Sequence, residues 1–293
     1  MAEPRPTPEQ LVARLLRLLD VTELGEDRFE GARKQGGIGR VFGGQVIAQA
    51  FAAAERTVDP ERAAHSLHAY FLRGGSEDHA IELQVRRDFD GGSFSNRRVI
   101  ASQQGRPILT LTAGFQRAQP GLHHQAPAMP DVPPPEELEM DEALRLRMAE
   151  HLTGRVRDFA LLQWPIEMRS VGGPQWALAA PREAAACAWF RAAAPLPDDP
   201  RIHRAVLAYA SDMQLLGTAT QPHGKNFWTG QVKLASLDHA LWFHEPFRAD
   251  EWLLYATDSP WSGGSRGFAR GQIFDRSGKL VASVTQEGML REA

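Results

Sequence analysis

The second half of the chain contains the stretch Ser236-Leu-Asp-His-Ala-Leu-Trp-Phe243, and the first half contains a looser copy of it, Ser66-Leu-His-Ala-Tyr-Phe71. Two more pairs of segments agree in the same order along the chain: Gly91-Gly-Ser93 with Gly263-Gly-Ser265, and Gly105-Arg-Pro-Ile-Leu-Thr-Leu-Thr112 with Gly278-Lys-Leu-Val-Ala-Ser-Val-Thr285. Turn residues and strand-forming residues agree together in each pair. Self-similarity of this kind indicates a duplicated structural unit, so we expect two related domains.

Each half is expected to place helices before strands. Apolar residues at helical spacing predict helices over 8–19 and 45–58 in the first half and over 201–216 in the second half. Residues that favour strands, separated by glycine-rich turns, predict the following strands: 66–73, 81–87, 93–103 and 108–116 in the first half, and 237–243, 252–257, 267–274 and 279–285 in the second. Helices followed by antiparallel strands predict an α+β fold.

A proline-rich segment separates the two halves. Six prolines fall between residues 120 and 135 without an apolar period, which is typical of a linker. We therefore expect an N-terminal domain over 8–118, a linker over 119–145 and a C-terminal domain over 146–293. Helical segments are expected between this linker and the helix over 201–216.

Composition excludes several classes of protein. The formal net charge of −3 over 293 residues argues against a nucleic-acid binder, which would show a basic excess. The single cysteine, Cys187, suits a reducing compartment. The chain shows no signal peptide, no run of eighteen apolar residues and no peroxisomal address in Leu290-Arg-Glu-Ala293. We expect a cytoplasmic protein without a membrane span.

Three familiar motifs are considered and rejected. The segment Gly263-Gly-Ser-Arg-Gly267 matches the nucleophile elbow, but a strand rather than a helix is expected after it, so it is interpreted as a hairpin. The segment Gly37-Ile-Gly-Arg-Val-Phe-Gly43 has one residue too many for a dinucleotide fingerprint, and no apolar strand precedes it. The ten histidines show no zinc-like spacing with cysteine or carboxylate, so no metal site is expected.

Three polar residues in the second half are candidates for chemistry. Asp212 falls among the apolar residues of its predicted helix, and Gln286 falls on the core-facing row of its predicted strand, where the first half has Ala113. Ser236 opens the predicted strand over 236–243. A carboxylate, an amide and a hydroxyl that converge would hold a water molecule and accept its proton.

Several long segments resemble the acyl-CoA thioesterase II family. They are Val41-Phe-Gly-Gly-Gln-Val-Ile-Ala-Gln-Ala50, His65-Ser-Leu-His-Ala-Tyr-Phe-Leu-Arg-Gly74, Gly91-Gly-Ser-Phe-Ser-Asn-Arg-Arg-Val99, Ser211-Asp212, Gln221-Pro-His-Gly224, Ser236-Leu-Asp-His-Ala-Leu-Trp-Phe-His244, Gly267-Phe-Ala-Arg-Gly271 and Gln286-Glu-Gly288. The resemblance runs from about residue 10 to residue 291.

The resemblance implies two tandem hotdog domains, each a long helix wrapped by an antiparallel sheet, that form a pseudo-dimer. It implies hydrolysis of fatty acyl-CoA to free fatty acid and CoA in lipid metabolism, without metal or cofactor and without a covalent intermediate. The family's catalytic aspartate, hydroxyl residue and glutamine correspond to Asp212, Ser236 and Gln286, with serine where many members have threonine.

Further contacts with the substrate are expected from glycine and arginine residues. Backbone N–H groups at Gly43 and Gly44, where a helix begins, are candidates to stabilise the oxyanion. Arginines on strands after the Gly-Gly-Ser turns are candidates to bind the phosphates of CoA, although solvated strand faces would also explain them. These arginines are Arg97, Arg98, Arg266 and Arg270.

Two other functions remain as alternatives. A hydratase acting on enoyl-CoA would use an aspartate and a histidine, but neighbours such as Asp238 and His239 face opposite sides of a strand. A non-catalytic hotdog protein that only binds acyl-CoA would be expected to lack a polar residue at 212 or 286. Because the exposed edges of such sheets usually pair, we also expect a homo-oligomer.

Overall fold

The computed structural model describes residues 5–34, 39–177, 180–225 and 230–293. Within these residues, the main helices are α1 (Pro8–Leu19), α2 (Gly43–Glu55), α3 (Asp141–Ala149), α4 (Gly154–Leu161) and α5 (Pro200–Ser211). Short 3₁₀ helices are η1 (Pro135–Glu137), η2 (Gln175–Ala177) and η3 (Leu215–His223).

The strands fall into two groups. The first half contributes β1 (Val21–Gly25), β2 (Arg28–Gly31), β3 (Arg62–Phe71), β4 (Ile81–Asp90), β5 (Phe94–Gln103) and β6 (Arg106–Arg117). The second half contributes β7 (Ile166–Ser170), β8 (Ala185–Ala192), β9 (Val232–Ser236), β10 (Asp238–Phe243), β11 (Leu253–Gly263), β12 (Arg266–Asp275) and β13 (Leu280–Glu292).

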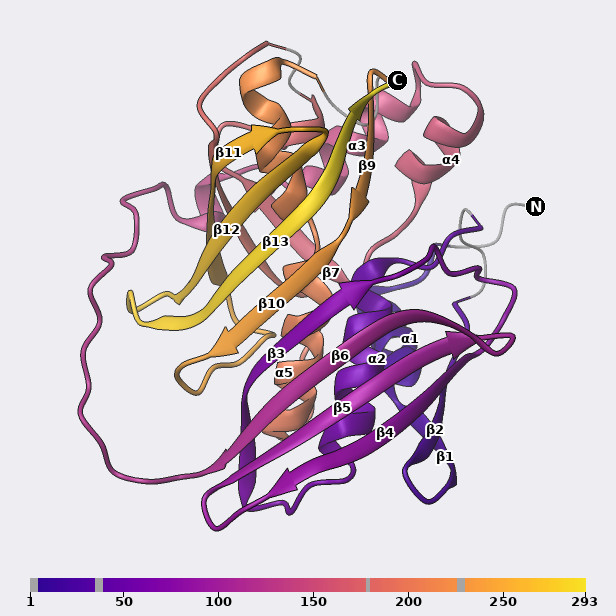
Figure 1. The fold of residues 1–293 in the computed structure, drawn as a ribbon. Coiled ribbons are helices and arrows are strands. Elements are labelled where there is room, and N and C mark those ends of the chain that lie inside the picture. Colours follow the sequence, from indigo (N-terminus) through magenta and orange to yellow (C-terminus); the bar gives the residue numbers. More distant parts are fainter. Residues whose placement is uncertain (1–4, 35–38, 178–179, 226–229) are drawn as a thin grey trace.

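All these strands form one antiparallel sheet in the order β1-β2-β4-β5-β6-β3-β10-β13-β12-β11-β8-β7, with β9 paired to β13. The two halves meet where β3 pairs with β10, from Ser66 opposite Trp242 to Tyr70 opposite Asp238. In Figure 1 the sheet curves around α2 and α5, which pack against each other. The predicted α+β architecture, with helices packed on a large antiparallel sheet, is therefore confirmed.

The central helix α2 forms where the sequence is small and apolar. In α2, the residues from Gly44 to Phe51 are all buried, because an alanine-rich helix that is apolar on nearly every side fits the interior of a curved sheet. The N-cap of α5 is Asp199, whose side chain accepts a hydrogen bond from the Arg201 N–H. The first part of the expected linker, residues 119–134, follows β6 as an extended segment along one side of both halves (Figure 1), whereas its later part contains η1 and the start of α3.

Several expected elements differ from those observed. The helix predicted over 201–216 ends at Ser211, because Gln214 adopts a left-handed conformation with φ of 67°. Strands β7 and β8 replace part of the helical region expected before residue 201, and the alanine-rich sequence of β8 gave no strand signal. The prediction over 236–243 merged the end of β9 with β10. The hairpin β1–β2 was not predicted.

The interpretation of residues 263–267 as a hairpin is confirmed. Gly263 pairs with Arg266 across a two-residue turn in which Gly264 and Ser265 have φ values of 55° and 62°. Two successive left-handed residues are typical of a tight turn between antiparallel strands. No helix follows Ser265, since the described chain continues there as β12, so this segment is no nucleophile elbow.

Candidate active site

Asp212 lies at the C-terminal cap of α5, facing the start of α2 from the other half of the chain. The Gly44 backbone N–H donates a hydrogen bond to its carboxylate. A Cβ atom at Gly43 would lie 2.7 Å from Asp212 Oδ2, and one at Gly44 would lie 2.3 Å from the Tyr209 carbonyl oxygen. Only glycine at these two positions allows the end of α5 and the start of α2 to approach so closely.

Gln286 connects Asp212 to Ser236. It lies on β13, fully buried, and its side-chain Nε2 donates to Asp212 Oδ1 at 2.6 Å and to Ser236 Oγ at 2.9 Å. Its carbonyl oxygen is also buried and has no hydrogen-bond partner among the described residues. The structure thus brings the three predicted residues together, and it assigns both amide hydrogens of Gln286 to the other two side chains.

The surroundings of Asp212 favour a carboxyl group that titrates near neutral pH. Burial raises the pKa of Asp212 to about 6, while hydrogen bonds from Gln286 and from the Gly44 N–H oppose the rise. The positive end of the α2 dipole acts in the same direction as these hydrogen bonds. At pH 7 to 8 the carboxylate is therefore mostly charged, with a higher proton affinity than an exposed aspartate.

A buried hydrogen-bond network supports the turn of α5 that precedes Asp212. His239 is fully buried, and its Nε2 lies 2.9 Å from Ser211 Oγ, which donates to the Ala208 carbonyl at 3.1 Å. The Tyr255 hydroxyl donates to the Ser211 carbonyl at 2.9 Å. Burial lowers the pKa of His239 to about 3, so this imidazole is neutral. Because the Ser211 proton is given to Ala208, the tautomer with a proton on Nε2 fits this contact.

Sequence reasoning did not assign this role to His239, although it did separate His239 from Asp238. The Asp238 carboxylate accepts a hydrogen bond of 2.6 Å from the Glu287 backbone N–H, whereas His239 faces the core beside α5. The predicted opposite orientation of the two residues is confirmed. Its core-facing position on β10 was the only available signal for His239, and the pattern could not identify Ser211 as its partner.

The four arginines expected to bind phosphate are engaged elsewhere. The prediction is wrong for Arg97, which is 2% exposed and uses its guanidinium inside the first half, on Thr57 and Asp90. The other three form exposed ion pairs on the outer face of the sheet, away from the face that carries Gln286. The pairs are Arg98 with Asp88, Arg266 with Glu287 and Arg270 with Asp258.

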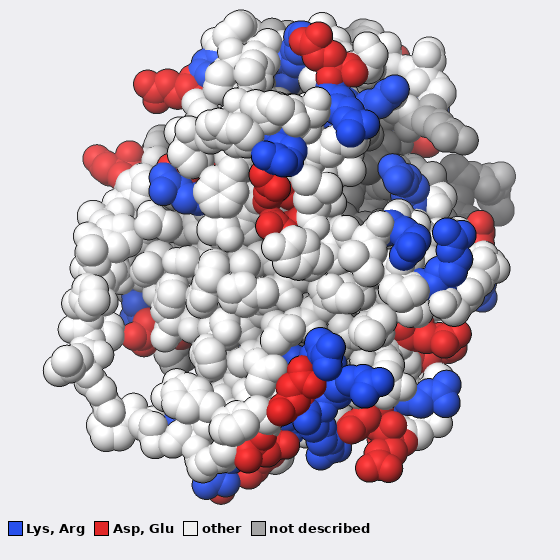
Figure 2. Space-filling view, viewed as in Figure 1, with Lys and Arg blue, Asp and Glu red and all other residues white. Residues whose placement is uncertain are grey.

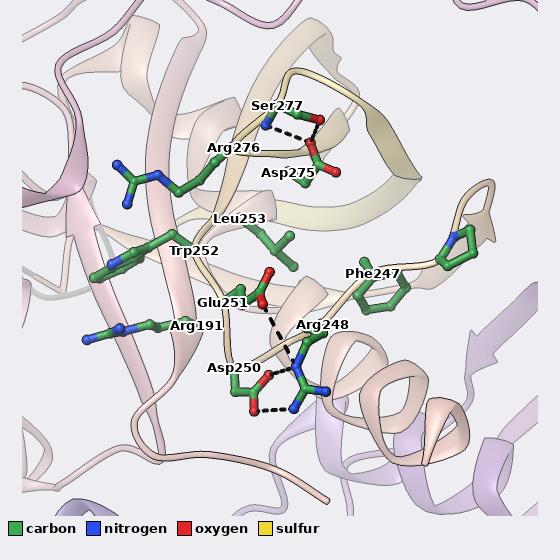
Figure 3. Close-up of a pocket in the computed structure, with 11 residues that line it drawn as sticks. Arg191, Phe247, Arg248, Asp250, Glu251, Trp252, Leu253, Asp275, Arg276 and Ser277 are labelled. Carbon is green, nitrogen blue, oxygen red and sulfur yellow. Dashed lines mark hydrogen bonds and ion pairs between the residues drawn. The ribbon is translucent and has the colours of Figure 1, made fainter. Parts of the chain in front are cut away.

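Figure 3 shows a pocket of about 580 Å³, and none of the three polar residues lines it. It is lined in part by the turn at residues 275–277, just before β13, so roughly 20 Å of strand separates it from Gln286. Its arginines already have partners: Arg248 pairs with Asp250 and Asp198, and Arg191 stacks on Trp252 and pairs with Glu167. We therefore do not place the reaction in this pocket.

Comparison with solved structures defines the class of the protein. A protein from Alicyclobacillus acidocaldarius that is described as having a hot dog fold superposes with a TM-score of 0.74 at 18% identity, covering 94% of this chain and 97% of that one. A helix wrapped by a curved antiparallel sheet is the same arrangement. The chain is a hotdog-fold protein.

The family follows from sequence. One family profile, described as acyl-CoA thioesterase, matches residues 176–289, and another, described as acyl-CoA thioesterase N-terminal domain, matches residues 32–116. Human acyl-coenzyme A thioesterase 8 is 40% identical over 283 residues, which cover 94% of this chain and 88% of that protein. The chain belongs to the acyl-CoA thioesterase family, as the resemblance predicted.

Two further relatives span nearly the whole chain. Acyl-CoA thioesterase 2 of Haemophilus influenzae is 36% identical over 279 residues, which cover 94% of this chain and 96% of that protein. The crystal structure of acyl-CoA thioesterase II TesB2 from Mycobacterium marinum superposes with a TM-score of 0.77 at 41% identity, covering 96% of this chain and 98% of that one.

Proposed function

We propose that the protein hydrolyses fatty acyl-CoA to the free acid and CoA, with a water molecule activated by Asp212. Family membership supports the reaction, and the contact of Gln286 with both Asp212 and Ser236 supports the site. The pattern of hydrogen bonds supports a water between these groups. Ser236 Oγ accepts from Gln286, so its own proton is available for a lone pair of water, while Asp212 has acceptor capacity left for a proton of that water.

The reaction is then a single displacement through a tetrahedral intermediate. The water oxygen bonds to the thioester carbon as its proton passes to Asp212, the C–S bond breaks, and the departing CoA sulfur takes the proton from Asp212. The buried and unpartnered carbonyl oxygen of Gln286 supports a bound water, because buried acceptors in proteins are normally satisfied. In this scheme the Gly44 N–H stabilises the Asp212 carboxylate rather than the oxyanion, because it donates its hydrogen bond to Asp212.

Two observations favour hydrolysis over the alternative functions. Asp238 and His239 have separate environments, which disfavours a hydratase that needs both on one substrate face. Asp212, Ser236 and Gln286 are all present and in contact, which disfavours a protein that only binds acyl-CoA.

We also propose that the halves are tandem hotdog domains of a pseudo-dimer, over 8–118 and 146–293, with one active site. In the first half, Ala113 pairs with Arg97 at the place where Gln286 pairs with Ala269 in the second. The amide of the second half thus has no counterpart, and the buried Arg97 guanidinium fills the interior near the end of α2.

The test of the proposed function is hydrolysis by the Asp212→Asn variant. This change keeps the volume and removes the base, so we expect kcat to fall by at least about 100-fold. Release of free thiol from a chain-length series of acyl-CoA substrates measures the rate. Wild-type protein that released no thiol from any substrate would contradict the function, and near-wild-type activity in the variant would contradict the role of Asp212.

A further inference from the structure

Two loops lead from the candidate active site to the surface. One precedes α2 and includes Arg40, and the other follows β3, whose last residue, Phe71, would lie 3.0 Å from a Cβ at Gly43. The loops are bound to each other: the Val41 N–H donates to the Gly75 carbonyl at 3.1 Å, and the Gly39 N–H donates to the Glu77 carboxylate at 2.6 Å. The described parts of the two loops are therefore held together close to Gly43, where a Cβ atom would lie 2.7 Å from Asp212 Oδ2.

Four cations lie on or beside these loops, and we call them the cationic rim: Arg33, Lys34, Arg40 and Arg73. None of them forms an ion pair with another described residue, in contrast to the paired arginines on the outer face of the sheet. In Figure 2, Lys and Arg side chains gather at the right of the view, near the loops that flank the tip of β3, while the centre of the sheet is almost uncharged.

Backbone contacts hold two of the arginines in place without neutralising their charge. One guanidinium N–H of Arg33 donates to the Asp78 carbonyl and one of Arg73 donates to the Pro107 carbonyl, both at 2.7 Å. A Cβ at Gly74 would lie 2.7 Å from Arg40 Nη2, so the Arg40 side chain rests on the other loop. An arginine held in this way loses little freedom when a phosphate binds to its remaining N–H groups.

The acidic groups of the same loops do not cancel these charges. Glu77 accepts the Gly39 N–H, and Asp78 accepts the Ser76 hydroxyl at 3.2 Å. The four cations thus exceed the two carboxylates.

An aromatic contact links the rim to the active site. Lys34 Nζ lies 5.4 Å from the ring centre of Trp164, and the same ring lies edge-on to Phe42, the residue before α2. The burial of Lys34 lowers its pKa, and the charge of Glu77 opposes this change.

We propose that the cationic rim binds the phosphate groups of the CoA moiety. The inference rests on the proposed function, because it requires a substrate whose reacting carbon lies at Asp212 and whose negative charge lies some distance away. CoA meets that requirement, since an uncharged pantetheine arm separates its thioester sulfur from its phosphates. The arm would pass Gly43 and Phe71, and the phosphates would reach the two loops.

The experiment compares Arg40→Ala/Arg73→Ala with wild type on three substrates that share one acyl group: acyl-CoA, acyl-3′-dephospho-CoA and acyl-pantetheine. For acyl-CoA we expect KM to rise by about 10- to 100-fold with kcat within about twofold, because charge-assisted contacts to a remote group act on binding. For acyl-pantetheine we expect no change. The KM of wild type should also rise with salt, and that of the variant should rise less.

Arg98→Ala is the matched control, because Arg98 is an exposed arginine paired with Asp88 on the outer face of the first half. It should leave all three KM values unchanged. An unchanged KM for acyl-CoA in the double variant would overturn the proposal, and so would an equal rise for acyl-pantetheine, which would indicate a structural defect.

Calorimetric binding of CoA separates failure of the rim from failure of the proposed function. If wild type hydrolysed no thioester but bound CoA, and the double variant bound CoA at least about tenfold more weakly, the rim would stand and the catalytic proposal would not. Equal CoA affinity in both proteins would overturn the rim. Inorganic phosphate and ADP, tested as competitors, show whether phosphate alone or the nucleotide is bound.

Discussion

At the scale of single residues, burial raises the pKa of Asp212 and two identified hydrogen bonds oppose the rise, and this allows a pH prediction. The pKa is about 6, so kcat/KM should fall as pH decreases through this value and the base becomes protonated. Gln286→Met removes a hydrogen bond that lowers the pKa, so its acidic limb should move to higher pH. A pH–rate profile measures the shift.

Ser236→Ala provides the control for this prediction. Ser236 contacts Gln286 rather than Asp212 in the hydrogen-bond network, so its removal should lower kcat while leaving the acidic limb near pH 6. A limb that moved equally in both variants, or that stayed at the same pH in Gln286→Met, would contradict the assignment of Asp212 as the titrating base.

The same pKa predicts that the buried Asp212 carboxylate lowers stability. The folded-state pKa of about 6 exceeds the ordinary value of 3.8, so the folded protein binds more protons between these values and its unfolding free energy falls as pH rises through that window. Above pH 6, Asp212→Asn should therefore raise the unfolding free energy by up to about 3 kcal/mol. Any access of solvent to the Asp212 carboxylate makes this gain smaller. Urea unfolding at pH 7.5 and pH 4 measures this, and the gain should disappear at pH 4.

Sequence periodicity could identify the polar residues that lie among apolar neighbours, but it could not identify their contacts with the other half of the chain. Asp212 and Gln286 attract attention because their spacing places them among apolar neighbours, and burial of Gln286 agrees with that pattern. The contact of Asp212 with Gly44 joins residues from different halves, and no local periodicity contains it. The prediction for Arg97 was wrong because spacing places a side chain on a face but does not identify partners such as Asp90.

At the scale of elements, α2 and α5 are joined by an ion pair at the end remote from Asp212. Arg204 on α5 donates to Glu55, the last residue of α2, at 2.8 and 2.9 Å, and both side chains are largely buried. Burial raises the pKa of Glu55 to about 7, and the charge of Arg204 opposes the rise. The two helices are thus in contact at both ends, through Glu55 and Arg204 at one end and through Asp212 and Gly44 at the other.

This pair predicts a pH-dependent loss of stability. Arg204→Leu leaves Glu55 buried without its cation, so the unfolding free energy should fall by about 3–5 kcal/mol at pH 8. The pKa of Glu55 should rise further in the variant. The loss of unfolding free energy should therefore be larger at pH 8 than at pH 6, because Glu55 takes up a proton at pH 6. Thermal or urea unfolding at the two pH values measures the difference.

The double variant Glu55→Gln/Arg204→Leu is the control for that prediction. It removes both charges, so it should recover most of the stability lost in Arg204→Leu at pH 8 and should show little of the pH dependence. A single variant with the same loss at pH 6 and pH 8 would show that lost packing, rather than the charge of Glu55, causes the effect.

The elements also show what sequence periodicity can and cannot predict. α1 was predicted with the observed bounds, because its leucines follow a clear helical period, and the structure adds a capping box at Thr7. β8 was missed, because its alanines and Cys187 carry little strand preference, and it is a strand because it pairs with β11 and β7. In such a segment the tertiary pairing decides the conformation.

At the scale of the whole molecule, oligomerisation remains a prediction. Copies of the chain would have to associate through a surface other than the edges of the sheet. The edge strands β1 and β7 have only five residues each, so they offer little backbone for pairing with another chain. No helix among the described residues is both long enough and apolar enough to cross a bilayer. Light scattering on the purified protein would determine the number of copies.

The proposed active site joins the two halves. Asp212, Ser236 and Gln286 belong to the second half, whereas Gly43 and Gly44 belong to the first, and β3–β10 pairing makes the sheet continuous. The linker contributes no strand to this interface and lies along the side of both halves (Figure 1). Activity should therefore require both halves but not the covalent link between them.

We predict that fragments 1–122 and 123–293, produced together, associate into an active enzyme. The cut falls beside Leu122, which is fully exposed, so it breaks little structure, and each fragment keeps its own helix and strands. The pair should copurify with a kcat within about tenfold of the intact chain. The fragment 123–293 alone should release no thiol, although it carries all three polar residues, because it lacks α2 and the Gly44 contact with Asp212. Activity in that fragment alone would show that the first half is not needed to complete the site.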